Sequence, residues 1–386
     1  MLSFWEQDAA PLYDALIVGG GLIGLSTAIQ VKRRKPQWRV AVLERGLLPS
    51  GASTRNAGFA CFGSLTEILS DIDRMGRDAA LALVERRFRG LHKLRETLGD
   101  GAIGYEHHGG FELFMDAQME ALHGLPSLNV WLRPIFKTDV FQLMKDRNGQ
   151  SAAAALGFNV RQVRAIVRNP FEGQLHSGRL MAALEVRARE TGVELRTGAE
   201  VVDFDENDAV ATLWARQPGS KDRIPFRAAQ VIFCANGYTH RLLPSLGIAP
   251  ARGQILVTEP VPDLKWKGCF HLDEGFVYFR DLATPEGTRI LLGGARNLAF
   301  EAEATDEMAV TPIIQGRLEQ LLQQTILPGK PVRIAKRWAG IMGFGPEKKP
   351  IVKRLGPRTL VAFGCNGMGV ALGSLIGEEA ALLALE

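Results

Sequence analysis

The fold of this chain is decided by residues 13–26, which read Tyr13-Asp14-Ala15-Leu16-Ile17-Val18-Gly19-Gly20-Gly21-Leu22-Ile23-Gly24-Leu25-Ser26. The apolar run up to Val18 gives way to three glycines, and apolar residues then resume at helical spacing. A continuous apolar run is typical of a strand buried on both faces, and clustered glycines mark a tight turn. The stretch predicts a buried strand, a turn, and a helix from Leu25 to Lys35.

The glycines of this turn have the spacing of a nucleotide-binding motif. Gly19, Gly21 and Gly24 match G-x-G-x-x-G, in which the glycines allow the turn, the approach of a pyrophosphate and close helix packing. A second apolar strand, 39–43, ends in Glu44, 20 residues after Gly24. A carboxylate at that distance binds the adenosine ribose and disfavours a 2′-phosphate, so we expect FAD or NAD rather than NADP. The alternative is a strand, turn and helix that bind no phosphate.

Length and composition indicate the number of domains and exclude some classes of function. At 386 residues the chain exceeds the size at which a single core stops growing, so we expect two domains. The net charge of +4, from 46 basic and 42 acidic residues, is small and dispersed and gives no support for nucleic-acid binding. The N-terminal residues 1–12 contain Glu6 and Asp8 and do not resemble a signal peptide, and no uncharged apolar run reaches the ~18 residues of a membrane span.

The cysteines indicate neither a disulfide framework nor a metal site. They are widely spaced, with no C-x-x-C pair, at Cys61, Cys234, Cys269 and Cys365. Such a pattern is typical of reduced, buried thiols. We therefore expect a cytoplasmic protein without a bound metal.

A specific family resemblance appears just after Glu44. The chain continues with Arg45-Gly46 and then with residues 50–58, which read S-G-A-S-T-R-N-A-G. A nucleotide motif followed by E-R-G and this segment resembles the flavoenzyme family of D-amino acid oxidase, glycine oxidase and sarcosine oxidase. The resemblance implies that Glu44 holds the ribose, that residues 50–53 line the pyrophosphate, and that residues 55–58 lie near the flavin. The alternative for this segment is a flexible surface loop.

Later motifs match the same family in order. The resemblance implies that the backbone of Val201 reaches the adenine and that Ala235-Asn236-Gly237 is a second turn at the dinucleotide. Residues 337–343, R-W-A-G-I-M-G, and 345–352, G-P-E-K-K-P-I-V, resemble the family's W-A-G strand and the turn after it. Residues 360–371 read as a strand, a glycine turn and a helix start, which in this family meets the flavin pyrimidine edge.

The resemblance also implies the fold class and the division of the chain. We expect an α/β protein with a Rossmann-type FAD-binding domain and a discontinuous substrate domain built on an antiparallel sheet. The FAD-binding domain would comprise residues 1–98, 155–248 and 332–386, and the substrate domain residues 99–154 and 249–331. The pattern around Gly109 and Gly110 predicts a hairpin over Ile103 to Met115.

The substrate end departs from the family pattern. In glycine oxidase the W-A-G strand continues with an arginine that pairs with the substrate carboxylate, whereas Met342 stands there in this chain. Tyr278 and Arg280 alternate onto one face of a strand expected to border the flavin. Arg280 is therefore our first choice for the anion contact, with Arg296 or Arg55 as alternatives. No cysteine lies between Cys269 and Cys365, so we expect FAD to be held without a covalent bond.

These residues together predict a function and a set of contacts. We expect an FAD-dependent oxidoreductase that oxidises a C–N bond of an amino acid or related amine by hydride transfer to flavin N5, with oxygen or another electron acceptor. The alternatives are a flavin protein that does not oxidise amines and an NAD-dependent dehydrogenase. The residues expected at the reacting atoms are Tyr278, Arg280 and Met342. The residues expected to bind the cofactor are Gly19, Gly21, Leu22, Ile23, Gly24, Glu44, Arg45, Ser50, Gly51, Ala52, Ser53, Arg55, Asn56, Ala57, Gly58, Val201, Ala235, Gly237, Gly340, Asn366, Gly367, Met368, Gly369 and Val370.

Overall fold

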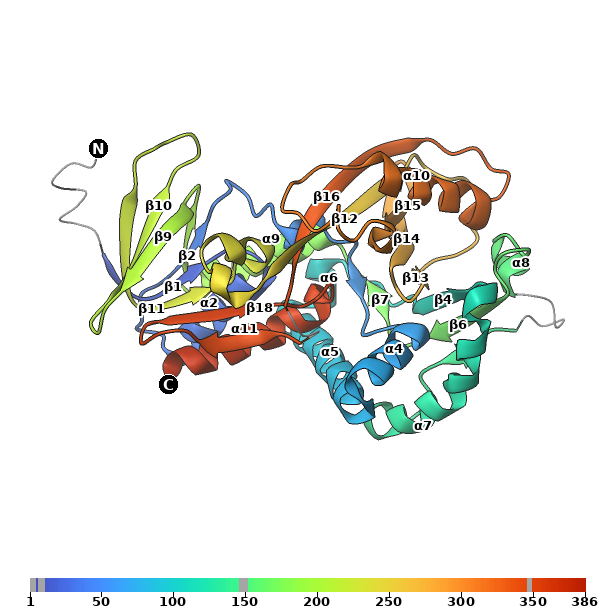
Figure 1. The fold of residues 1–386 in the computed structure, drawn as a ribbon, viewed down its shortest axis with the longest axis horizontal. Helices are drawn as coiled ribbons and strands as arrows, with labels where there is room; N and C mark the ends of the chain where they lie inside the picture. The colour runs from blue at the N-terminus through green and yellow to red at the C-terminus, as the bar shows by residue number, and fades with distance from the viewer. Residues whose placement is uncertain (1–4, 6–10, 146–151, 346–348) are drawn as a thin grey trace.

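Two eight-stranded sheets carry the fold of the protein (Figure 1). The structure is a computed structural model, and it describes residues 5, 11–145, 152–345 and 349–386. Part of the turn predicted after the W-A-G strand, residues 346–348, lies outside the described residues. In Figure 1 the first sheet occupies the left half of the molecule and the second sheet the right half.

The first sheet has a parallel core, as the glycine motif predicts. β1 pairs in parallel with β2 and β11, β2 with β8, and β11 with β18. Antiparallel strands extend it: β17 at one edge, β10 beside β11, and β9 beside β10. The strands are β1 (Leu12–Val18), β2 (Val40–Glu44), β8 (Glu194–Thr197), β9 (Glu200–Glu206), β10 (Ala211–Arg216), β11 (Ile224–Phe233), β17 (Ile351–Arg354) and β18 (Thr359–Phe363).

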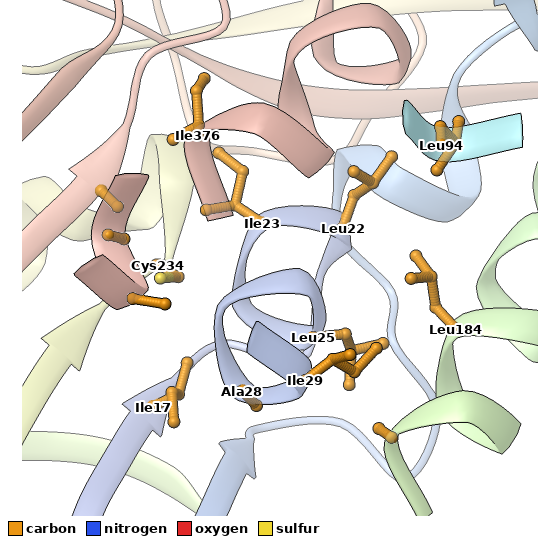
Figure 2. Close-up of a cluster of buried hydrophobic side chains, with 14 of the residues drawn as sticks. Ile17, Leu22, Ile23, Leu25, Ala28, Ile29, Leu94, Leu184, Cys234 and Ile376 are labelled. Atoms are coloured by element: carbon orange, nitrogen blue, oxygen red, sulfur yellow. The ribbon is translucent and has the colours of Figure 1, made fainter. Parts of the chain in front are cut away.

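Helices cover one face of this sheet and build its main core. They are α2 (Leu22–Arg34), α5 (Arg77–Leu98), α9 (Ser177–Glu190) and α11 (Gly369–Leu385). Figure 2 shows Ile17 of β1, Leu25 of α2, Leu184 of α9 and Ile376 of α11 in this cluster of buried side chains. Helix α2 begins directly after Gly21, three residues earlier than the predicted start at Leu25, because Gly24 in its first turn looks like part of the glycine turn in the sequence.

Two glycines of α11 decide how closely it packs against α2. A Cβ on Gly373 would lie 2.0 Å from the Leu22 side chain, and one on Gly377 would lie 2.5 Å from the Ser26 side chain. Glycines four residues apart share one face of a helix, so they leave a groove for the neighbouring helix. The C-terminal helix is thereby held against the first turn of the nucleotide motif.

The second sheet is mostly antiparallel, with the strand order β16-β12-β15-β14-β13-β4-β6-β5. Its strands are β4 (Gly110–Phe114), β5 (Gln142–Leu143), β6 (Ala165–Asn169), β12 (Ala249–Thr258), β13 (Cys269–Leu272), β14 (Val277–Thr284), β15 (Gly287–Gly294) and β16 (Ile334–Phe344). The α/β fold class with two such sheets is thus confirmed. The predicted hairpin over Ile103 to Met115 is wrong, because residues 100–103 form helix α6 (Asp100–Ile103) and β4 pairs with the distant strands β6 and β13.

Sheet membership and the predicted domain limits differ at two strands. β6 and β16 belong to the second sheet, although the limits 155–248 and 332–386 assign their residues to the FAD-binding domain. Because sharing a sheet does not by itself delimit a folding unit, the limits stay a prediction. The remaining short elements are the β3 (Phe59–Ala60) and β7 (Gly173–Gln174) pair and helix α3 (Ala52–Arg55). Helices α4 (Leu65–Met75) and α7 (Leu125–Phe136) pack with α5, β4 and β6, and α8 (Ala152–Leu156) and α10 (Pro312–Leu321) pack into the core of the second sheet.

Candidate active site

A cavity of about 940 Å³ runs along the ends of the first sheet and under the second, at the upper end of the range for ligand sites. Its walls come from the glycine turn, from α3 and α4, and from strands of both sheets. Most residues predicted to bind the cofactor or the substrate line it. These are Gly19, Gly21, Leu22, Ile23, Glu44, Arg45, Gly51, Ala52, Ser53, Arg55, Asn56, Ala57, Val201, Ala235, Tyr278, Gly340, Met342, Asn366, Gly367, Met368, Gly369 and Val370.

The glycine turn is held open by close backbone contacts. Gly19 has a φ of +110°, and a Cβ there would lie 2.7 Å from the carbonyl oxygen of Cys234. Gly21 is the N-cap of α2 and carries no side chain that caps the helix. The backbone N–H of Leu22 donates to Ser53 Oγ at 2.9 Å. This bond occupies one donor at the start of α2, and the other N–H groups of a first helical turn have no partner within the helix, so they are the donors that would bind a phosphate there.

Glu44 is fixed at the end of β2 by two backbone donors. The Gly20 N–H donates to Glu44 Oε2 at 2.9 Å, and the Gly46 N–H donates to Oε1 at 3.0 Å. Each oxygen keeps a lone pair for a further partner. The carboxylate thus stands at the cavity beside the glycine turn, where a ribose contact is expected.

The small-residue segment after Glu44 is tied to the W-A-G strand. Arg55 donates from Nε to the carbonyl of Ser50 at 2.9 Å and from Nη1 to the carbonyl of Ala339 at 3.0 Å. The indole of Trp338 donates to the carbonyl of Arg55 at 2.9 Å. These bonds make the segment an ordered wall rather than a flexible loop, and they engage the guanidinium of Arg55 with backbone oxygens.

Five of the predicted residues lie behind the wall of the cavity. A Cβ on Gly24 would lie 1.9 Å from the Gly19 oxygen, and one on Gly237 would lie 2.6 Å from the Met342 oxygen, so both glycines serve close packing. Ser50 accepts the bond from Arg55 described above. Gly58 has a φ of +74° and packs against Leu175.

Arg280, the fifth, is buried beneath Gly58. Its side chain is 5% exposed, and its Nη2 lies 3.3 Å from where a Cβ on Gly58 would stand. Burial lowers the pKa of the guanidinium, and its Nε has no hydrogen-bond partner among the described residues. Arg280 shares the strand face of Tyr278 but not its access to the cavity.

Arg296, named above as an alternative anion contact, lines the cavity instead. Its guanidinium lies 4.5 Å from the ring centre of Phe344 and 4.9 Å from that of Phe300. It follows Ala295, which has a φ of +59°, so a left-handed residue at the end of β15 turns the chain toward the cavity. Partial burial lowers the pKa of Arg296, as expected for a cation that stands in an apolar wall.

Sequence reasoning missed several residues at the same end of the cavity. They are Glu67, His271, Phe276, Phe300 and Phe344. His271 is paired with Tyr278 in the register between β13 and β14, and its ring packs edge-on against Phe59 at 5.2 Å. No local motif marks these residues. The signal that could have found His271 is the register of two strands, which a single sequence does not reveal.

Comparison with known proteins identifies the family. The family model described as DAO, FAD dependent oxidoreductase, matches residues 14–383. The chain belongs to this family. Its cofactor is FAD, so the NAD-dependent alternative is set aside. The turn at Gly21, the donors at the start of α2, the Glu44 carboxylate and the size of the cavity fit an extended dinucleotide.

Individual relatives agree with this assignment. The chain is similar to glycine oxidase of Geobacillus kaustophilus, at 26% identity over 325 residues that cover 75% of this chain and 76% of the relative. The crystal structure of that enzyme matches with a TM-score of 0.74 and 23% identity over 97% of this chain and 94% of the other. The structure of L-proline dehydrogenase from P. horikoshii matches with a TM-score of 0.73 and 18% identity, covering 97% and 93%.

A third relative is longer than this chain. The bifunctional protein ThiO/ThiG of Synechocystis sp. is 26% identical over 246 residues, which are 63% of this chain and 32% of that protein. The match thus spans about a third of its length.

Within the residues that the structure describes, no helix is both long and apolar enough to cross a membrane, and no three His, Cys, Asp or Glu side chains group as a metal site.

Proposed function

We propose that this DAO-family protein oxidises the C–N bond of an amino acid or a closely related amine, with FAD held in the cavity by non-covalent contacts. The observation that carries the proposal is the position of Arg296. It is a cation in an aromatic wall of the cavity, directly after β15 of the second sheet, whereas the glycine turn follows β1 of the first sheet. Such a cation suits a single carboxylate, which binds a guanidinium through paired hydrogen bonds.

The chain's own residues have binding and positioning roles in this reaction. FAD supplies the hydride acceptor, flavin N5, which is reoxidised by oxygen or another acceptor. Arg296 holds the carboxylate of the substrate, and Tyr278 and Met342 bound the space beside it. Phe276, Phe300 and Phe344 exclude water, which strengthens the ion pair and protects the imine until it is released.

Flavin reduction by a panel of amines tests the function. The holoenzyme is mixed anaerobically with glycine, sarcosine, D-alanine, L-proline and the polyamine putrescine, and the flavin absorbance is followed. We expect at least one of the four carboxylate-bearing amines to bleach the flavin, and putrescine to react more slowly because it offers Arg296 no anion. If none of the five amines bleaches the flavin, the alternative of a flavin protein without amine oxidation is favoured.

The burial of the cysteines predicts how FAD is retained. Cys61, Cys234 and Cys365 line the cavity. Burial raises the pKa of Cys234 and of Cys365 to about 12 and that of Cys61 well above its usual range, so all three stay as weakly nucleophilic thiols. We therefore expect acid precipitation to release all of the flavin into the supernatant. Yellow colour that remains in the washed pellet would contradict a non-covalent site.

A further inference from the structure

A pair of buried ionisable side chains borders the substrate end of the cavity. His271 lines the cavity, yet its Nε2 is buried and has no hydrogen-bond partner within the part of the chain that the structure describes. That nitrogen lies 3.8 Å from Oε2 of Glu172, a carboxylate that is 1% exposed. The imidazole thus stands between the cavity and a carboxyl group that substrate does not reach.

Glu172 is held in a fixed position. Its Oε1 accepts bonds from the Phe62 N–H at 3.0 Å and the Gly63 N–H at 3.4 Å. Its Oε2 packs against Gly110, where a Cβ would lie 1.9 Å away. With one oxygen bound by backbone donors, the other is left for His271, and a rotation of the imidazole that closes about 1 Å brings the two atoms to hydrogen-bond distance.

The chemistry of the proposed function leaves a proton to be placed. An amino acid is bound as an ammonium ion, and only the neutral amine transfers a hydride from its carbon. The N–H bond must therefore break before the C–H bond, with its electron pair staying on nitrogen. The site needs a base within reach of the cavity, and Arg296 does not supply one because a guanidinium stays protonated.

We propose that His271 and Glu172 form a proton relay that accepts the ammonium proton of the substrate. The substrate proton passes to Nδ1 of His271, and the proton on Nε2 passes to the ionised carboxylate of Glu172. The imidazole is neutral before and after, and Glu172 ends as a carboxylic acid. This inference rests on the proposed function, because another reaction would release no such proton.

Burial and the charges around His271 and Glu172 set the pH range in which the relay can accept a proton. The nearest titratable and charged groups are Glu67 of α4, Arg87 of α5, Glu112 of β4, Cys269 of β13, Tyr278 of β14, and Cys61 and Tyr105 of the adjoining loops. Burial, with smaller contributions from Glu67 and Glu112, raises the pKa of Glu172 to about 8, and burial lowers that of His271 to about 4. Glu67 is itself paired with Arg87 at 3.2 Å.

These directions give the sign of the pH dependence. Glu172 accepts a proton only when it is ionised, so the accepting form is present above pH 8 and is lost as the pH falls through that value. His271 stays neutral over this range because its pKa is depressed. The rate of flavin reduction should therefore rise with pH and level off above about 8.

Anaerobic stopped-flow reduction of the holoenzyme tests the relay, with the fastest amino acid of the panel as substrate. We expect Glu172→Gln to lower the limiting rate about 100-fold and to remove the break near pH 8. His271→Gln should do the same, and the double variant should lose no more than either single one, because the two act as a unit. The control is Glu112→Gln, a buried glutamate bonded to Ser64 and Thr66 that does not line the cavity. It should keep the limiting rate and a break, which moves to lower pH because Glu112 no longer raises the pKa of Glu172.

A spectroscopic measurement tests the relay without turnover. In holoenzyme labelled with ¹⁵N-histidine, one of the seven histidines should report Glu172 by a shift with its midpoint near pH 8 while it remains neutral. That resonance should be missing from His271→Gln and should lose its shift in Glu172→Gln. A wild-type His271 resonance that does not move through pH 8 overturns the relay.

The two proposals fail in different ways. If no amine reduces the flavin, the proposed function fails, and the relay falls with it. If amino acids reduce the wild-type flavin and Glu172→Gln retains the rate and its pH break, the relay is wrong and the proposed function stands.

Discussion

Replacing Gly21 by valine is expected to yield a protein that purifies without FAD. A Cβ at position 21 would lie 3.0 Å from Ser53 Oγ, on the path that the pyrophosphate takes to the start of α2. Gly21 has an extended backbone with a φ of −80°, so the valine is excluded by the cofactor and not by backbone strain. Losing two charge-assisted bonds of about 1.5 to 3 kcal/mol each lowers the affinity roughly 100- to 20,000-fold.

The ratio of flavin to protein absorbance after purification measures this effect, and circular dichroism checks the fold. Gly316→Val is the matched control, because Gly316 has open space around its Cβ and lies in α10, away from the cavity. The control protein should carry full flavin. A Gly21→Val protein that is as yellow as the control would show that the pyrophosphate does not pass this glycine.

Replacing Arg296 by methionine is expected to abolish most of the preference for amines that carry a carboxylate. A charge pair with hydrogen bonds in a closed site contributes about 2 to 5 kcal/mol, so kcat/KM for the best amino acid should fall roughly 30- to 5,000-fold. Putrescine, which has no carboxylate, should lose far less. FAD content should not change, because Arg296 lies at the substrate end of the cavity.

Two other arginine variants show whether the effect of Arg296→Met is specific to that position. Arg280→Met tests the anion contact that sequence favours, and we expect a small effect because Arg280 lies behind the cavity wall. Arg289→Met changes a residue of β15 that is bonded to the carbonyl of Thr258 and is remote from the cavity. A large loss in Arg280→Met with none in Arg296→Met would return the role to Arg280.

The features that could be predicted are those whose cause lies in neighbouring residues. The turn at Gly19 needs a positive φ, and the helix after it needs a close approach, and both requirements show as glycines within a few positions. Glu44 could be predicted because a helix and a strand of ordinary length place it 20 residues after Gly24. The family resemblance extended this reasoning to the later motifs, and the comparisons confirm the family and the α/β fold.

The predictions that failed or stayed open depend on distant parts of the chain. The segment around Gly109 looks like a hairpin because a glycine pair often marks a turn, but β4 gains more by pairing with β6 and β13. Tyr278 and Arg280 do alternate onto one strand face. Alternation does not reveal how far along the strand the cavity extends. The cavity reaches Tyr278 and ends before Arg280.

The sequence by itself determined the glycine turn and the place of Glu44 after it, because steric requirements of the backbone act over a few residues and leave a local pattern. The fold class followed from the family resemblance that these motifs carry. Only the tertiary structure decided that Arg296 lines the cavity while Arg280 does not, and that His271 lies near Glu172 of a separate segment. Those contacts depend on the register of strands and the packing of one sheet over the other. The free energies that fix strand register and sheet packing are sums of many weak interactions between distant residues, so no short stretch of sequence encodes them.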